Sequence, residues 1–320
     1  MPTPDRGTQA HAQQMRQYMN PVVVSKIQHM EMRARLIVEG FLTGLHKSPY
    51  HGFSVEFAEH RAYNPGESLR AIDWKVYGRT EKLYTKRFEE ETNLRCYVVL
   101  DTSDSMRYPL TGMSKLVYGA NLMGALGYLM VKQRDAVGLC LFDTSLHTYL
   151  PPKATRSWLY RIFQSLQQTI DQAERFTHQT ATAQVLHTLS QKLHPRSLVV
   201  ILSDLFGDPA QLDALLPALQ RLRHMKHEVL IFQMLEPRTE AQFEFANQPL
   251  ILQDLETGER LKVNPETIRT RYQAYFEAYQ RQLHRRCREL NIELIELDVN
   301  QPFDKALTDY LRKRSHIRRA

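Results

Sequence analysis

The length and composition of the chain are those of an ordinary folded protein. It has 320 residues, of which 42% are hydrophobic and 24% are charged, and its formal net charge is +7. These proportions exclude global disorder, and the low glycine and proline content excludes a collagen-like or low-complexity chain. The length accommodates two domains, or one large domain with extensions.

Hydropathy and cysteine content give two further expectations. The longest apolar runs lie near residues 97–100, 198–202 and 229–235, well short of the roughly 20 residues that a transmembrane helix needs. The first residues, MPTPDRG, lack the apolar core of a secretory signal. Cysteines stand at positions 96, 140 and 287, so we expect no disulfide framework, no CxxC metal site and a reducing, cytoplasmic location.

The first 92 residues are expected to form a flexible end, a helix and a small β-rich subdomain. Residues 1–20 are polar and rich in glutamine, which is typical of a flexible terminus. Residues 22–46 carry apolar side chains at helical spacing. Residues 50–92 contain short β-like segments, and the sequence NPGE at residues 64–67 matches a type II turn. We therefore assign residues 21–92 to an N-terminal helix and a small β-rich subdomain.

From residue 94 onward, buried strands alternate with helices. The predicted strands span residues 94–100, 136–142, 197–203, 228–234 and 292–297, and the predicted helices span about 113–132, 155–170, 182–193, 209–225, 265–289 and 302–313. Strands that are apolar throughout are typical of parallel sheets covered by helices on both faces. The pattern predicts an α/β fold with a doubly wound, mainly parallel, Rossmann-like sheet over residues 93–313. Residues 240–264 are predicted to be a β-insertion, and residues 314–320 a basic tail.

Polar residues gather where the predicted strands end. Asp101, Ser103 and Ser105 follow the first strand, Thr180 precedes a helix, and Asp204 ends the third strand. Ligands of open α/β sheets bind beyond the carboxyl ends of the strands. All five side chains offer oxygen atoms, which suit Mg²⁺ or Mn²⁺ better than Zn²⁺. We predict a metal site here; the alternative is a capping loop that satisfies backbone N–H groups and keeps the fold without a metal.

This pattern resembles the metal-ion-dependent adhesion site of von Willebrand factor A domains. The resemblance rests on Asp101-x-Ser103-x-Ser105 followed by Thr180 and Asp204. It implies that the serines and the threonine hold the metal directly or through water, that the aspartates bind it directly or support its ligands, and that an open position accepts a carboxylate from a partner. Many domains of that family have two glycines before the threonine, where this chain has His178 and Gln179.

Further motifs resemble the bacterial domain-of-unknown-function 58 family. They are HRAYNPGE at residues 60–67, RAIDWK at 70–75, KRFEEE at 86–91 and DLETGE at 254–259. The resemblance extends over about residues 35–315 and implies a chaperone-like or metal-insertion factor that acts with a MoxR-type AAA+ ATPase. Arg and Trp are common anchors of interfaces, so the candidate partner-binding residues are Arg61, Tyr63, Arg70, Asp73 and Trp74. Alternatively, these residues form the core and ion pairs of the small β-rich subdomain.

Two functional classes follow from the predicted metal site. The preferred hypothesis is a non-enzymatic interaction protein whose metal binds a carboxylate of a client or partner, with the ATPase supplying energy. The alternative is a metal-dependent hydrolase or phosphatase. A haloacid-dehalogenase pattern would need aspartate where Ser103 stands. The sequence contains no GxxxxGKS/T or GxGxxG loop, so we expect no binding of ATP or a dinucleotide through such loops.

A third hypothesis is weak binding of nucleic acid or another anionic surface through the basic end. Residues 281–320 contain ten Lys and Arg and six Asp and Glu, a net charge of +4, which leaves +3 for residues 1–280. The sequence has no basic stripe interleaved with aromatic residues and no nucleic-acid-binding motif. We therefore expect no sequence-specific nucleic acid binding and at most a salt-sensitive attraction. The simpler interpretation is a solvated helix end and tail.

Overall fold

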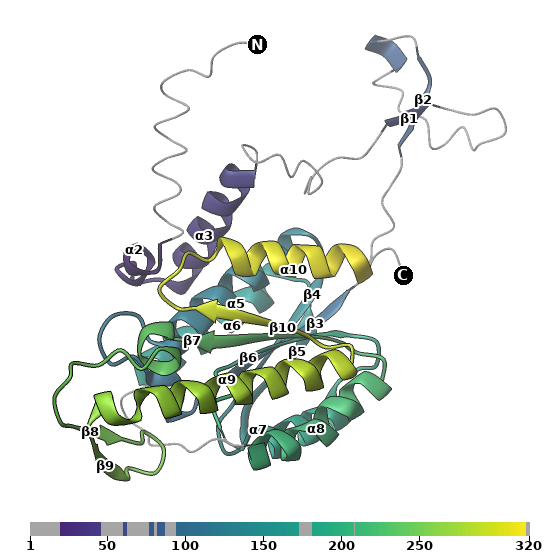
Figure 1. Cartoon of the computed structure of the whole chain (residues 1–320). Helices are drawn as coiled ribbons and strands as arrows, with labels where there is room; N and C mark the ends of the chain where they lie inside the picture. Colours follow the sequence, from purple (N-terminus) through teal and green to yellow (C-terminus); the bar gives the residue numbers. More distant parts are fainter. Residues whose placement is uncertain are drawn as a thin grey trace.

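The computed structural model describes residues 20–45, 60–62, 77–79, 82–86, 94–172, 181–207 and 209–317. Its body is a six-stranded sheet with helices on both faces (Figure 1). Along the sheet the strands are β10 (Glu293–Asp298), β7 (Glu228–Leu235), β6 (Leu198–Ser203), β3 (Arg95–Asp101), β4 (Ala136–Phe142) and β5 (Leu146–Lys153). Neighbouring strands are parallel except β5, which is antiparallel to β4. The predicted α/β fold with a mainly parallel sheet is thus confirmed.

The strands lie where apolar runs occur in the sequence. β6 is buried at all of its residues, and β3, β4 and β7 are buried at all but their first. Apolar side chains on both faces of a strand are shielded from water only when helices cover both faces of the sheet. The two helical layers described next provide that cover.

Each face of the sheet has its own layer of helices. One buried cluster joins the sheet to α3 (Met30–Leu45), α5 (Lys115–Lys132), α6 (Arg156–Gln172) and α10 (Asp304–Ile317). The other joins it to α7 (Thr182–Lys192), α8 (Pro209–His224) and α9 (Pro265–Glu289). α5 is the most deeply buried of these helices, with 14 buried residues, and Ser114 caps its start by accepting a hydrogen bond from Val117 N. This cap fixes where the chain turns from the end of β3 into the sheet-covering helix.

The antiparallel edge strand β5 was not predicted from the sequence. Its segment LHTYLPPK contains two prolines, and proline is tolerated only at sheet edges or irregular positions because it cannot donate a ladder hydrogen bond. The pairing with β4 is irregular between Val137 and Leu139. Gly138 lies at this irregularity, where a Cβ atom would stand 2.7 Å from the carbonyl oxygen of Leu150. Glycine therefore lets the two backbones come close.

Several other elements differ from the sequence-based expectations. The predicted N-terminal helix is divided into α2 (Pro21–Ser25) and α3. The predicted β-insertion contains the antiparallel pair β8 (Leu250–Gln253) and β9 (Arg260–Val263), but residues 243–245 are not a strand, and Phe243 has a positive φ of 52°. A short π-helical turn, η3 (Pro237–Ala241), follows β7, and α10 continues to Ile317, four residues beyond its predicted end.

The predicted β-rich subdomain is described only in part. β1 (His60–Ala62) and β2 (Tyr84–Lys86) form an antiparallel pair. The predicted turn at residues 64–67 lies outside the described residues, as do Tyr63, Arg70, Asp73 and Trp74. Arg61 is described by its backbone in β1 alone. Among the described residues, no helix is both long and apolar enough to cross a membrane.

Candidate metal site

The predicted site residues lie at the carboxyl ends of two adjacent parallel strands. β3 ends at Asp101, and the chain continues through Ser103 and Ser105 into the short 3₁₀-helix η2 (Asp104–Arg107). β6, paired in parallel with β3, ends at Ser203 and is followed by Asp204. The parallel register sets Leu100 beside Leu202, so the two loops leave the sheet side by side. The fold therefore brings together residues that are about a hundred positions apart in the sequence.

Asp101 is fully buried at the base of the site. Its Oδ1 accepts a hydrogen bond from Ser103 N at 3.0 Å, and its Oδ2 accepts one from Ser203 Oγ at 2.7 Å. Burial, together with the charge of Asp204, raises the pKa of Asp101 to about 7. A positive charge near this carboxylate would favour its ionised form.

The hydroxyl groups of Ser103 and Ser105 lie next to each other in the loop after Asp101. Their oxygen atoms are 3.1 Å apart, and Ser103 is fully buried. Adjacent oxygen ligands of an octahedral Mg²⁺, at about 2.1 Å from the ion, lie about 3 Å from one another. The two hydroxyls thus have the spacing of neighbouring Mg²⁺ ligands.

Asp204 is held by a buried lysine that the sequence analysis did not single out. Lys115 Nζ donates to Asp204 Oδ2 at 2.8 Å and to Glu240 Oε1 at 2.7 Å, and its side chain is only 1% exposed. Burial alone would lower the pKa of Lys115, but the negative charges of Asp204 and Glu240 outweigh it and raise that pKa. The sequence feature that could have identified Lys115 is its position at the start of a predicted helix that is otherwise almost free of charged residues.

Negative charge predominates in this buried cluster. Asp101, Asp204 and Glu240 bring three carboxylates, and Lys115 brings one ammonium group. Burial raises the pKa of Glu240 even though Lys115 opposes the shift. Buried carboxylates are unfavourable unless a cation or a proton compensates them. A divalent cation beside Asp101 would supply that compensation.

The donor set fits a hard cation such as Mg²⁺ or Mn²⁺. Hydroxyl and carboxylate oxygens are the ligands that these ions prefer, and two or more waters would complete the shell. Within the described ranges, no group of three or more His, Cys, Asp and Glu is placed to hold a metal, so a site here must rely on serine hydroxyls. The remaining predicted ligand, Thr180, lies outside the described residues, which resume at Ala181.

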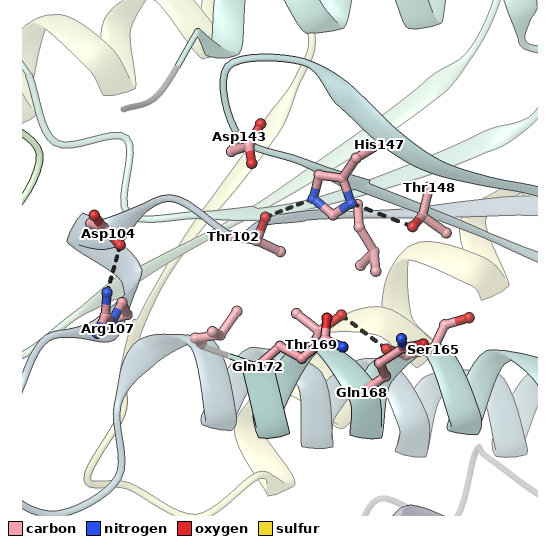
Figure 2. A pocket seen from close by; sticks show the side chains of 12 residues that line it. Thr102, Asp104, Arg107, Asp143, His147, Thr148, Ser165, Gln168, Thr169 and Gln172 are labelled. Carbon is pink, nitrogen blue, oxygen red and sulfur yellow. Dashed lines mark hydrogen bonds and ion pairs between the residues drawn. The ribbon is translucent and has the colours of Figure 1, made fainter. Parts of the chain in front are cut away.

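A pocket of about 350 Å³, lined mostly by polar residues, lies beside the loop that carries Ser103 and Ser105 (Figure 2). Thr102 and Asp104 from this loop line it, together with residues of β4, β5 and α6. Thr102 Oγ1 is 3.0 Å from His147 Nε2, and Arg107 Nη1 donates to Asp104 Oδ1 at 2.8 Å. These contacts fix the outer side of the loop that carries Ser103 and Ser105.

The structure therefore brings four of the five predicted metal ligands to one edge of the sheet. Lys115 and Glu240 join them as unpredicted neighbours of Asp204. The side chains of the predicted partner-binding residues lie outside the described part of the chain.

The solved structures that this chain matches include those of two bacterial proteins. A conserved hypothetical protein, BatB, from Bacteroides thetaiotaomicron aligns with 71% of this chain and 100% of its own, at 12% sequence identity and a TM-score of 0.45. An aerotolerance-related membrane protein from Bacteroides fragilis aligns with 70% of this chain and 99% of its own, at 15% identity and a TM-score of 0.48.

Sequence comparison identifies the family. Uncharacterized proteins of Mycobacterium bovis and Mycobacterium tuberculosis are 23% identical over 239 residues, which are 75% of this chain and 73% of theirs. The model of the family described as "Protein of unknown function DUF58" matches residues 59–284. This match spans most of the chain and includes the sheet from β3 to β7, so the chain belongs to the DUF58 family.

Proposed function

We propose that this protein is a non-enzymatic, metal-dependent protein-interaction module with a von Willebrand factor A-like domain. Asp101, Ser103, Ser105, Thr180 and Asp204 would hold Mg²⁺ or Mn²⁺. The observation that carries the proposal is the pair of hydroxyl oxygens of Ser103 and Ser105, 3.1 Å apart beside the buried carboxylate of Asp101. The bound ion would supply a positively charged position open to an oxygen ligand of another protein.

The strand order supports the von Willebrand factor A-like assignment. The strand that carries Asp101 lies inside the sheet, between β6 and β4, and the antiparallel strand β5 closes one edge. The loops after β3 and β6 therefore meet at an inner position of the sheet's carboxyl edge, where ligands of open α/β folds bind.

The charge of the site favours a carboxylate as the partner's ligand. Lys115 already compensates part of the charge of Asp204, so Asp204 gives a bound ion less negative charge than an unpaired aspartate would. A divalent ion with serine ligands and the carboxylate of Asp101 keeps net positive charge, which attracts an anion. An aspartate or glutamate of a client protein meets this requirement.

The proposed partner is a MoxR-type AAA+ ATPase, in chaperone-like assembly or maturation of protein complexes. Support comes from the family resemblance and from the sequence itself, which contains no GxxxxGKS/T loop through which the chain could use ATP. A cytoplasmic location belongs to the same proposal, since all three cysteines are buried and free. Purification of the tagged protein from its native cell, with Mg²⁺ or with a chelator, should recover an AAA+ ATPase only when the metal is present.

Two basic residues of α10, Arg312 and Lys313, have a structural role in this proposal. Arg312 Nη2 is 2.8 Å from Glu293 Oε1, and Lys313 Nζ is 3.1 Å from Glu228 Oε2. These pairs attach α10 to the first residues of β10 and β7. The side chains of the predicted basic tail, residues 314–320, lie outside the described part of the chain.

The metal proposal is tested by thermal unfolding with and without Mg²⁺. A ligand that binds only the native state stabilises it by about 2.7 kcal/mol at a hundred times its Kd. Mg²⁺ should raise the Tm of the wild type and of the control Asp213→Ala, which alters an exposed aspartate on α8. It should leave the Tm of Asp101→Ala unchanged; an equal rise in Asp101→Ala would refute the assigned site.

The same variant tests the non-enzymatic part of the proposal. Phosphate esters incubated with the protein and Mg²⁺ should show no turnover above that of Asp101→Ala. Metal-dependent hydrolysis that Asp101→Ala abolishes would favour the hydrolase hypothesis instead.

A further inference from the structure

A small, mainly apolar pocket lies beside the loop that follows β6 and carries Asp204. It has a volume of about 140 Å³ and sits between the first turns of α7 and α8, which lie side by side in Figure 1. Ala183 of α7, Leu212 and Leu215 of α8, and Tyr279 of α9 form its apolar wall. Asp204 and the preceding Ser203 form the side that faces the site.

The pocket has the size of one aliphatic or aromatic side chain. A cavity of about 150 Å³ lined by Leu, Ile and Phe stays free of water and binds benzene. Leu212 and Leu215 are almost fully buried, so a group that enters meets apolar surface and leaves water.

The pocket and the candidate metal site share a wall. Ser203 lines the pocket, and its hydroxyl donates to Asp101 Oδ2 at 2.7 Å. Asp204 belongs both to the pocket and to the predicted ligand set. A partner segment that places a carboxylate at the metal therefore has the pocket within reach of a neighbouring side chain.

The rim of the pocket is held in place and carries an exposed aromatic ring. Tyr279 donates from its hydroxyl to the carbonyl oxygen of Leu205 at 2.6 Å, which fixes the loop after β6. Phe206 follows in that loop, lines the pocket and is 44% exposed. Its ring stands 6.3 Å from that of Phe276. An exposed phenylalanine beside an apolar pocket adds contact area for an apolar group of a partner.

We propose that this pocket takes an aliphatic side chain of the same partner segment whose Asp or Glu carboxylate binds the metal. The inference rests on the proposed function, because it takes the metal-bound carboxylate as its starting point. It adds a specificity rule: the partner presents an acidic residue next to a medium-sized apolar residue such as leucine. The metal would select for the acidic residue of the partner, and the pocket would select for the apolar residue next to it.

The test uses NMR titrations of the full chain with capped tetrapeptides in the presence of Mg²⁺. Gly-Asp-Leu-Gly and Gly-Leu-Asp-Gly cover both orders of the two side chains. Each is compared with a peptide in which alanine replaces leucine and with one in which asparagine replaces aspartate. At least one leucine peptide should bind tenfold or more tightly than its alanine counterpart, and its leucine methyls should show NOEs to Leu212 or Leu215.

Two variants fill the pocket from different helices. Ala183→Leu acts from α7 and Ala214→Leu from α8, and both alanines line the pocket. Ala278→Leu, at an exposed position of α9, is the matched control. The filled variants should keep the Mg²⁺-induced rise in Tm and should bind the leucine and alanine peptides equally, whereas the control should retain the preference. Having two variants guards against one that fails to fold.

The remaining outcomes separate this inference from the proposed function. If leucine and alanine peptides bind equally and only with Mg²⁺, the pocket is not used and the metal-carboxylate proposal stands. If the leucine peptides bind equally well with a chelator, or with asparagine in place of aspartate, the coupling of pocket and metal is refuted. If Mg²⁺ raises the Tm but no peptide binds, both the carboxylate acceptor and the pocket inference are wrong.

Discussion

Lys115 Nζ lies 2.8 Å from Asp204 Oδ2 in a buried pair that connects the start of α5 to the loop after β6. The same ammonium group lies 2.7 Å from Glu240 Oε1 in η3, the turn that follows β7. Glu240 is fixed in turn, because its Oε2 accepts a hydrogen bond from Glu236 N at 2.7 Å. One buried cation therefore holds together two loops at the carboxyl edge of the sheet.

The first prediction concerns stability. Lys115→Met leaves Asp204 and Glu240 buried without their cation, and removal of one partner of a buried ion pair costs about 3–5 kcal/mol. The double variant Lys115→Met/Glu240→Gln removes one charge of each sign, and a glutamine oxygen can still accept from Glu236 N. Chemical denaturation should show a large loss of unfolding free energy in the single variant and clear recovery in the double variant. A single variant within about 1 kcal/mol of the wild type would contradict the role assigned to Lys115.

The second prediction concerns the metal. In the double variant Asp204 Oδ2 has lost its ammonium partner, so this oxygen can serve a bound cation. We expect the affinity for Mn²⁺, measured from the electron paramagnetic resonance signal of the free ion, to rise about tenfold, which corresponds to about 1.4 kcal/mol. The exposed-site control Asp213→Ala should keep the wild-type affinity. Unchanged or weaker binding in the double variant would mean that Lys115 does not limit the contribution of Asp204.

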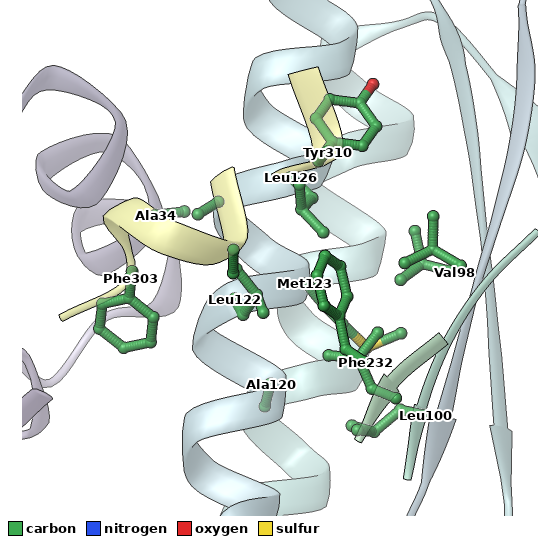
Figure 3. Close-up of a cluster of buried hydrophobic side chains, with 14 of the residues drawn as sticks. Ala34, Val98, Leu100, Ala120, Leu122, Met123, Leu126, Phe232, Phe303 and Tyr310 are labelled. Carbon is green, nitrogen blue, oxygen red and sulfur yellow. The ribbon is translucent and has the colours of Figure 1, made fainter. Parts of the chain in front are cut away.

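The sequence predicted the central architecture because its signals are local. Five apolar runs became five parallel strands, and the apolar surface of the predicted helix over 113–132 became the core of α5, where Leu122, Met123 and Leu126 pack against the sheet and α10 (Figure 3). The edge strand β5 was missed because two prolines and irregular burial hide its alternation. Such a strand is defined by its pairing with β4, which sequence periodicity does not report.

The candidate site was predictable to the same extent. Asp101, Ser103 and Ser105 form a motif of fixed spacing, and the parallel sheet places Asp204 beside them. Lys115 and Glu240 belong to segments 125 positions apart, and only the fold reveals that they meet. The apolar pocket between α7 and α8 is likewise a product of tertiary packing.

The third prediction tests the close approach of β4 and β5. Gly138→Ala would place a Cβ atom 2.7 Å from the carbonyl oxygen of Leu150 and 3.0 Å from the nitrogen of Pro152, both backbone atoms that cannot rotate away. Overpacking of this kind costs about 1–3 kcal/mol. Hydrogen exchange of the β5 amides should accelerate along with the loss of stability. Gly127→Ala in α5 is the control, because its nearest contact is a leucine methyl at 3.2 Å and the helix gains from alanine. Equal stability in Gly138→Ala and wild type would show that β5 does not need this glycine.

The last prediction is a pH dependence of stability that arises from His227. This histidine is buried, and its Nδ1 accepts a hydrogen bond from Ser197 N at 3.3 Å, so the neutral ring fits the site. Burial lowers its pKa below the ordinary value of 6.5, and the charge of Arg223 adds to this effect. Between the lowered folded-state pKa and about 6.5, the unfolded chain binds a proton that the folded chain does not, so unfolding free energy rises with pH in that window. The contribution is fully present above about pH 6.5 and is lost as the pH falls through the folded-state pKa.

His227→Asn isolates this contribution, because the asparagine oxygen can accept from Ser197 N and does not titrate. Urea unfolding between about pH 5 and 7 should give a flatter pH profile for His227→Asn than for the wild type. His187→Asn, at an exposed position of α7, should keep the wild-type slope. Subtraction of the variant curve from the wild-type curve removes the contribution of other groups that titrate in this range, including Asp101, whose pKa is raised to about 7. Parallel curves for His227→Asn and wild type would show that His227 can take up a proton in the folded state without loss of stability.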